Sequence, residues 1–96
     1  MIYTQLDPSY KYDVLADAIY SREVEYFHYN FDLQNFTQIM GTLADGDYKN
    51  QIQERIDSTN VQMNNVKKIY DALLSQVDDE TAYNAACVRA VARRAA

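Results

Sequence analysis

The sequence predicts an all-α protein, a long antiparallel helical hairpin of coiled-coil type followed by a short C-terminal helix. Two glycines and one proline are the only strong helix breakers among the 96 residues, which favours long, uninterrupted helices. Along two stretches the apolar side chains recur at alternating spacings of four and three, the pattern of a helix that packs along its length. A short polar turn separates the stretches, as an antiparallel hairpin requires. The length fits a single helical domain over residues 1–96.

The first helix is predicted over about residues 8–43. Asp7 suits the N-cap position and Pro8 the first helical position, where a missing N–H costs nothing. From there to Leu43 only Gly41 would interrupt a helix, and the 4,3 spacing runs along the segment. Its hairpin-core members are Leu15, Ile19, Tyr26, Leu33, Phe36 and Met40. This stripe is expected to face the second helix.

The second helix is predicted over about residues 47–76. Gly46 can adopt a left-handed conformation that ends the first helical segment, and Asp47 can cap the next helix. The same spacing then supplies the opposing half of the hairpin core. Its members are Ile52, Ile56, Met63, Val66, Tyr70 and Leu73.

A third helix is predicted over about residues 80–93. Acidic residues precede it and Arg93 and Arg94 end it, which complements the helix dipole at both ends. Tyr83, Ala86, Cys87 and Ala90 form a narrow face of mostly small side chains. The pattern is compatible with a helix that folds back on the hairpin and with one that extends away.

The first helix carries a second apolar stripe, nearly opposite the first, formed by Tyr20, Val24, Phe27 and Phe31. One companion helix can cover only one side, and a helix that is apolar on two sides is usually buried on both. The third helix has too many alanines to cover four large side chains. We therefore expect this stripe to be an interface, with a homo-oligomer as the outcome. A dimer that completes a four-helix bundle is the simplest closed form.

Charge and composition limit the other partners and the compartment. The net charge is −5, and residues 1–45 hold two basic against seven acidic side chains, which argues against contacts with nucleic-acid phosphates in this half. The single cysteine cannot form an internal disulfide. Because the sequence shows neither a signal-peptide pattern nor an apolar run of membrane-spanning length, we expect a cytoplasmic protein, in its own cell or an infected one, that is neither secreted nor transmembrane.

An alternative function is metal binding by Glu25, His28 and Asp32. The Glu-x-x-His pair at residues 25–28 resembles the motif of ferritin-like di-iron proteins, which implies a carboxylate and an imidazole directed at one metal ion. In that family the facing helices also supply inward carboxylates, whereas the inward positions of the second helix here are mostly apolar. The ordinary explanation is a surface cluster of a histidine between acids. We therefore expect no metal and no cofactor.

A second alternative is weak nucleic-acid binding through the basic C-terminal helix, with Arg89, Arg93 and Arg94 as the contacts. Arginines at a helix end more often complement the dipole, and no recognition motif accompanies them. Nucleophilic or phosphate-binding motifs are also missing from the sequence, so we expect no catalytic residues and no enzyme. The leading hypothesis is a non-enzymatic structural or adaptor protein that acts by self-association and partner binding.

Overall fold

The computed structural model describes residues 9–96 and confirms the predicted all-α class. These residues form three α-helices, α1 (Tyr10–Met40), α2 (Asp47–Leu74) and α3 (Glu80–Ala95), and no strand occurs among them. The predicted N-cap at Asp7 and Pro8 lies outside the described residues.

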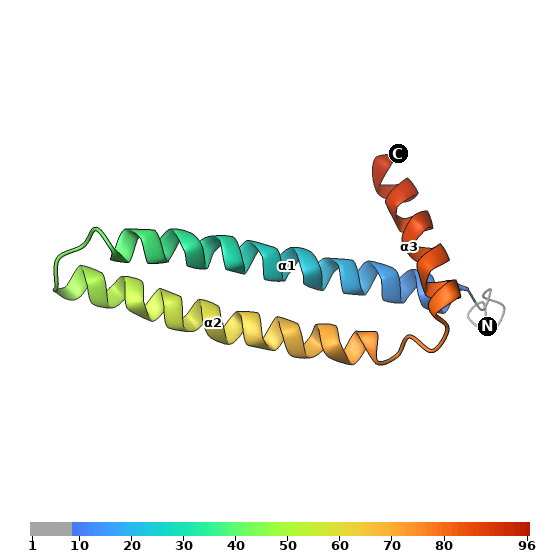
Figure 1. Cartoon of the computed structure of the whole chain (residues 1–96), viewed down its shortest axis with the longest axis horizontal. Helices are drawn as coiled ribbons and strands as arrows, with labels where there is room; N and C mark the ends of the chain where they lie inside the picture. Colours follow the sequence, from blue (N-terminus) through green and yellow to red (C-terminus); the bar gives the residue numbers. More distant parts are fainter. Residues whose placement is uncertain (1–8) are drawn as a thin grey trace, which may run out of the picture.

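The two long helices lie side by side and run in opposite directions (Figure 1). The connection between them forms one end of the molecule, and α3 is at the other end, near the start of α1 (Figure 1). The molecule is elongated, with principal extents of 61 × 26 × 25 Å. The length of α1 and α2 accounts for this shape, since a helix rises about 1.5 Å per residue.

The helix boundaries near the turn differ slightly from the expected ones. α1 ends at Met40 because Gly41 is a poor helix former and the Thr42 hydroxyl donates to the Ile39 carbonyl at 2.8 Å, which closes a local turn. Gly46 has a φ of 148°, a conformation that favours glycine, and it is the N-cap residue of α2. Asp47 is the first helical residue instead of the cap, and its carboxylate still complements the N-terminal dipole.

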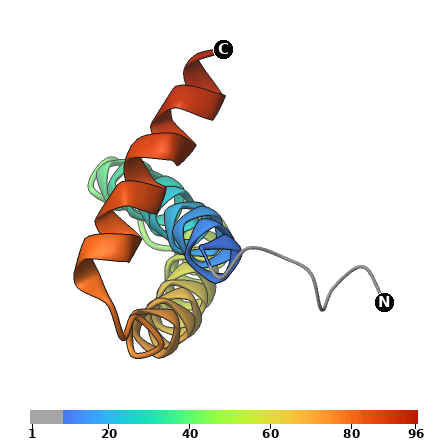
Figure 2. The same cartoon turned by 90° about the vertical axis from the view of Figure 1, so that its right-hand side faces the viewer.

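The third helix crosses the N-terminal part of α1, and its C-terminal end points away from the two long helices (Figures 1 and 2). The Asp79 side chain caps α3 by accepting from the Ala82 N–H at 3.0 Å. At its other end α3 continues to Ala95, two residues further than expected. The sequence is compatible with a third helix that folds back and with one that extends away. In the structure α3 packs on α1 and therefore folds back within the same chain.

The buried part of the α1–α2 contact is narrow. Leu15, Ile19, Met63 and Val66 are buried. The remaining members of the expected core are half-buried, with one exception; they are Leu33, Phe36, Met40, Ile52, Ile56, Tyr70 and Leu73. The exception is Tyr26, which is 41% exposed. Two helices alone can bury only the line where they touch, so side chains on either flank of that line stay partly open to water.

A second small core forms where α3 meets α1. Ala16, Ala86 and Ala90 are almost fully buried there, with Tyr12, Tyr83 and Cys87 packed around them. Alanines let the two helix backbones approach closely, which suits a short helix with little side-chain volume.

None of the helices in residues 9–96 combines the length with the apolar character that crossing a membrane requires.

Candidate functional site

The face of α1 that points away from α2 is divided into two regions. Its residues follow one another at helical spacings of three and four, and they are Asp13, Asp17, Tyr20, Val24, Phe27 and Phe31. The first part, up to Tyr20, lies against α3, whereas the later part is beyond the reach of that helix. We call Tyr20, Val24, Phe27 and Phe31 the aromatic face.

Arginines of α3 hold the first region. Arg89 lies 2.9 Å from Asp13, and Arg93 lies 3.2 Å from Asp17. Asp13 is the least exposed of these side chains, at 24%. The acids and the arginines are each four residues apart in their own helices, so two successive turns of α1 match two successive turns of α3.

Arg94 links this ion-pair cluster to the aromatic face. Its guanidinium carbon lies 3.5 Å from the centre of the Tyr20 ring, and one of its nitrogens lies 3.7 Å from Asp17. A cation stacked on an aromatic ring in this way is attracted to the negative face of the ring. Tyr20 is therefore shared between the region under α3 and the open aromatic face.

The segment that leads into α3 is also tied to α1. The Tyr12 hydroxyl donates to Asp78 at 2.6 Å, and Lys11 forms an ion pair with Asp78 at 3.1 Å. The hydrogen bond with Asp78 is the main cause that raises the pKa of Tyr12 to about 12, and the same bond lowers the pKa of Asp78. Burial, followed by hydrogen bonding to Cys87, raises the pKa of Tyr83.

The middle of the aromatic face is open. Phe27 is 69% exposed and Phe31 is 57% exposed, the two largest exposures among the aromatic residues of α1. Tyr20 is 43% exposed, and Val24 is half-buried. Phe27 and Phe31 are thus two bulky apolar side chains that lie one helical turn apart and are largely open to water.

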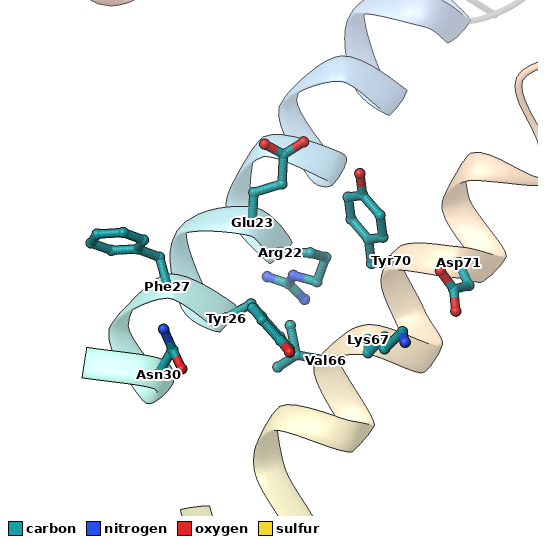
Figure 3. A pocket seen from close by; sticks show the side chains of 9 residues that line it. All are labelled: Arg22, Glu23, Tyr26, Phe27, Asn30, Val66, Lys67, Tyr70 and Asp71. Atoms are coloured by element: carbon teal, nitrogen blue, oxygen red, sulfur yellow. The ribbon is translucent and has the colours of Figure 1, made fainter. Parts of the chain in front are cut away.

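A pocket of about 500 Å³ opens between α1 and α2 beside this face (Figure 3). Its apolar lining consists of Tyr26 and Phe27 from α1 with Val66 and Tyr70 from α2. In Figure 3 the Tyr26 ring is directed towards Val66, while Phe27 stands on the outer rim. The pocket thus begins where the aromatic face ends.

The rim of the pocket is charged. Glu23 stands on the α1 side with Asn30, and Lys67 and Asp71 stand on the α2 side (Figure 3). Arg22 lies between the two helices, where one of its terminal nitrogens is 2.8 Å from Glu25 and its Nε is buried without a hydrogen-bond partner.

The residues of the alternative metal site lie on α1 but do not form a ligand cluster. Glu25 pairs with Arg22, whereas His28 and Asp32 line a second, more open hollow together with Phe27 and Phe31. Within residues 9–96 no group of three or more His, Cys, Asp or Glu side chains is arranged to hold a metal ion. His28 and Asp32 instead form the polar border of the aromatic face.

The arginines considered for nucleic-acid binding are engaged within the chain. Arg89, Arg93 and Arg94 all pair with aspartates of α1. These pairs partly neutralise the arginines, so an incoming phosphate would have to compete with a carboxylate.

Sequence reasoning missed two features of this surface. The spacing predicts Tyr26 in the hairpin core, yet Tyr26 is 41% exposed and forms a pocket wall beside Phe27. The ion pairs between α1 and α3 had a signal in the matching four-residue spacings of Asp13 with Asp17 and of Arg89 with Arg93. That signal becomes meaningful only when the two helices are known to touch.

The fold and this surface together define a class: an all-helical protein whose first helix exposes aromatic side chains beside a pocket between two helices. No family model, curated protein or solved structure matches the chain.

Proposed function

We propose that this chain is a non-enzymatic structural or adaptor protein that associates with copies of itself through the aromatic face of α1. The observation that carries the proposal is the exposure of Phe27 and Phe31, at 69% and 57%, on a helix whose opposite side already packs on α2. Covering a phenylalanine side chain is worth roughly 1.5–3 kcal/mol compared with leaving it in water. A chain with two such residues side by side gains considerably from a partner.

The favoured assembly is a dimer in which the two aromatic faces meet. Each copy contributes α1 and α2, and because the aromatic face points away from α2, the two α1 helices form the contact while each α2 lies on the outer side. The four long helices then form a layer instead of the four-helix bundle expected from the sequence. Tyrosine and phenylalanine suit such a contact because aromatic rings bring large contact areas and are enriched in the buried cores of interfaces. A further macromolecule could then bind to the assembled surface as the adaptor role requires.

Solution mass measurement tests the proposal. Sedimentation velocity at micromolar concentration should show a dimer of the 11.1 kDa chain. The double substitution Phe27→Asp and Phe31→Asp should give a folded monomer, because two charges would have to be buried in the contact. The matched control is Tyr48→Asp with Val61→Asp, which alters exposed apolar residues of α2 at 66% and 56%.

The control variant should keep the mass of the wild type. Circular dichroism of each variant reports whether the helices persist. A monomeric wild-type protein at these concentrations would contradict the proposal, and so would an oligomer that the Phe27 and Phe31 substitutions leave unchanged.

A further inference from the structure

The third helix is attached to the rest of the molecule mainly through α1. Among residues 9–96 the backbone of α3 approaches that of α1 and not that of α2. Residues 75–79 connect α3 to the end of α2, and the C-terminal end of α3 points away from both long helices (Figures 1 and 2). Loss of the α1–α3 contact would therefore leave α1 packed on α2.

The apolar part of the α1–α3 contact is small. Its buried members are three alanines, and each of them contributes a single methyl group; they are Ala16, Ala86 and Ala90. The α1–α2 contact buries larger side chains, those of Leu15, Ile19, Met63 and Val66. Because apolar stabilisation scales with the area removed from water, it favours the α1–α2 contact over the docking of α3.

Ion pairs supply much of the remaining contact between α3 and α1. Arg89 lies 2.9 Å from Asp13, Arg93 lies 3.2 Å from Asp17 and 3.8 Å from Asp13, and Arg94 lies 3.7 Å from Asp17. Residues 81–96 contain these three arginines and no acidic residue. The charges that meet in this contact are thus positive on α3 and negative on α1.

Dissolved salt has access to these pairs. The three arginine side chains are 34–48% exposed, and Asp17 is 58% exposed. The screening length of exposed charges falls from about 30 Å at 0.01 M salt to about 3 Å at 1 M. Salt therefore weakens the docking of α3 much more than the apolar α1–α2 contact. A released α3 of 16 residues is close to the length at which an isolated helix is marginal in water, so its amides lose protection.

We propose that α3 is an electrostatic latch on α1, which stays docked at low ionic strength and is released when salt screens its ion pairs, while α1 and α2 stay packed. Release frees the three arginines together, because all of them pair with the same two aspartates. It also removes Arg94 from the ring of Tyr20, where its guanidinium carbon lies 3.5 Å from the ring centre. The latch is made within one chain and does not depend on self-association.

Hydrogen exchange at two salt concentrations tests the latch. The full chain is followed by mass spectrometry at constant pH and temperature, in about 0.02 M and about 0.5 M NaCl. The amides in the middle of α3 should exchange about tenfold faster at the higher concentration, because several exposed ion pairs weaken together. Exchange in the centres of α1 and α2 should change less than about twofold, which also corrects for any effect of salt on the chemistry of exchange.

Neutral substitutions should have the effect of salt. Asp13→Asn with Asp17→Asn should speed α3 exchange at low salt and remove most of its salt dependence. Arg89→Gln with Arg93→Gln should do the same from the other helix. All four changes together should add little to either pair, because both pairs of substitutions break the same contacts.

The matched control is Asp32→Asn with Glu54→Gln. It removes as many negative charges as the Asp13 and Asp17 variant, but neither residue takes part in an ion pair with α3. This control should keep the salt dependence of the wild type. Exchange in α3 that ignores salt, or that accelerates equally in all three helices, would overturn the latch. Slow α3 exchange at low salt in the Asp13 and Asp17 variant would also overturn it.

Discussion

The two regions of the outward face of α1 differ in whether α3 covers them. Under α3, α1 presents the small side chain of Ala16 and the carboxylates of Asp13 and Asp17, so the alanines of α3 pack closely and its arginines reach the two acids. About two helical turns beyond Tyr20 the side chains are bulky, and within residues 9–96 Phe27 and Phe31 remain largely exposed. Small side chains allow a short helix to cover a surface in cis, whereas large aromatic ones need the volume of a larger partner.

The sharpest way to test this difference is to truncate one large side chain that packs inside the chain and one on the open face. Ile19 is 1% exposed, and Ile19→Ala should lower the free energy of unfolding by about 2–5 kcal/mol, since it removes buried methylene groups and leaves a cavity. Phe27→Ala should cost less than about 1 kcal/mol when the protein is dilute enough to be monomeric. Urea unfolding followed by circular dichroism measures both values. Equal costs would mean that Phe27 is buried within a single chain.

A smaller effect is expected from overfilling the contact between α1 and α3. Ala86 is fully buried against Ala16 and Ala90, so Ala86→Leu should destabilise the docked α3 by about 1–3 kcal/mol. Hydrogen exchange should then increase for the amides of α3 and remain slow in the centres of α1 and α2. Val88→Leu is the control, because Val88 is 71% exposed on the same helix. Faster exchange throughout the molecule would instead show that α3 is required for the α1–α2 contact.

The smallest effect is the pH dependence of the segment that enters α3. The pKa of Asp78 is lowered from 3.8, chiefly by the Tyr12 hydroxyl, so its contribution is fully present above about pH 4 and is lost as the pH falls through the lower folded value. The pKa of Tyr12 is raised from 10.0 to about 12, so its contribution is fully present below pH 10 and is lost as the pH rises through about 12. Docking of α3 should therefore weaken at both extremes and stay constant between them.

The measurement for this prediction is exchange or chemical shift of α3 amides across the pH range. Tyr12→Phe should reduce the alkaline loss, because it removes the hydroxyl that donates to Asp78, whereas the contribution of Tyr83, whose pKa is also raised, remains. Tyr48→Phe, at an exposed position of α2, is the control and should leave the alkaline loss in place. An alkaline loss that is unchanged in Tyr12→Phe would assign all of it to another group.

The all-α class and the two apolar sides of α1 could be predicted because both depend on spacing within one helix. A period of 3.6 residues sets which side chains share a face, whatever the rest of the chain does. For this reason the spacing alone predicts Leu15 and Ile19 on one side of α1, and Phe27 and Phe31 on the other. The exposures of 1% for Ile19 and 69% for Phe27 follow the same division.

The position of Tyr26 could not be predicted in this way. Its spacing puts it on the stripe that faces α2, yet it lies on the flank of that stripe, where the packing of two helices leaves room for a pocket. Whether a flanking side chain is covered depends on what occupies the neighbouring volume, and α3 does not extend over this part of α1.

The sequence by itself therefore determined the all-helical class and the two opposite apolar sides of α1, since backbone geometry converts local spacing directly into a surface. Tertiary structure alone decided that α3 folds back over Ala16, that Arg89 and Arg93 reach acids 76 residues away, and that the aromatic face ends beside a pocket. Those contacts join residues far apart in the chain. These contacts form only where the side chains of both helices are small enough or well enough matched for the helices to approach. The sequence of one helix does not determine that distance.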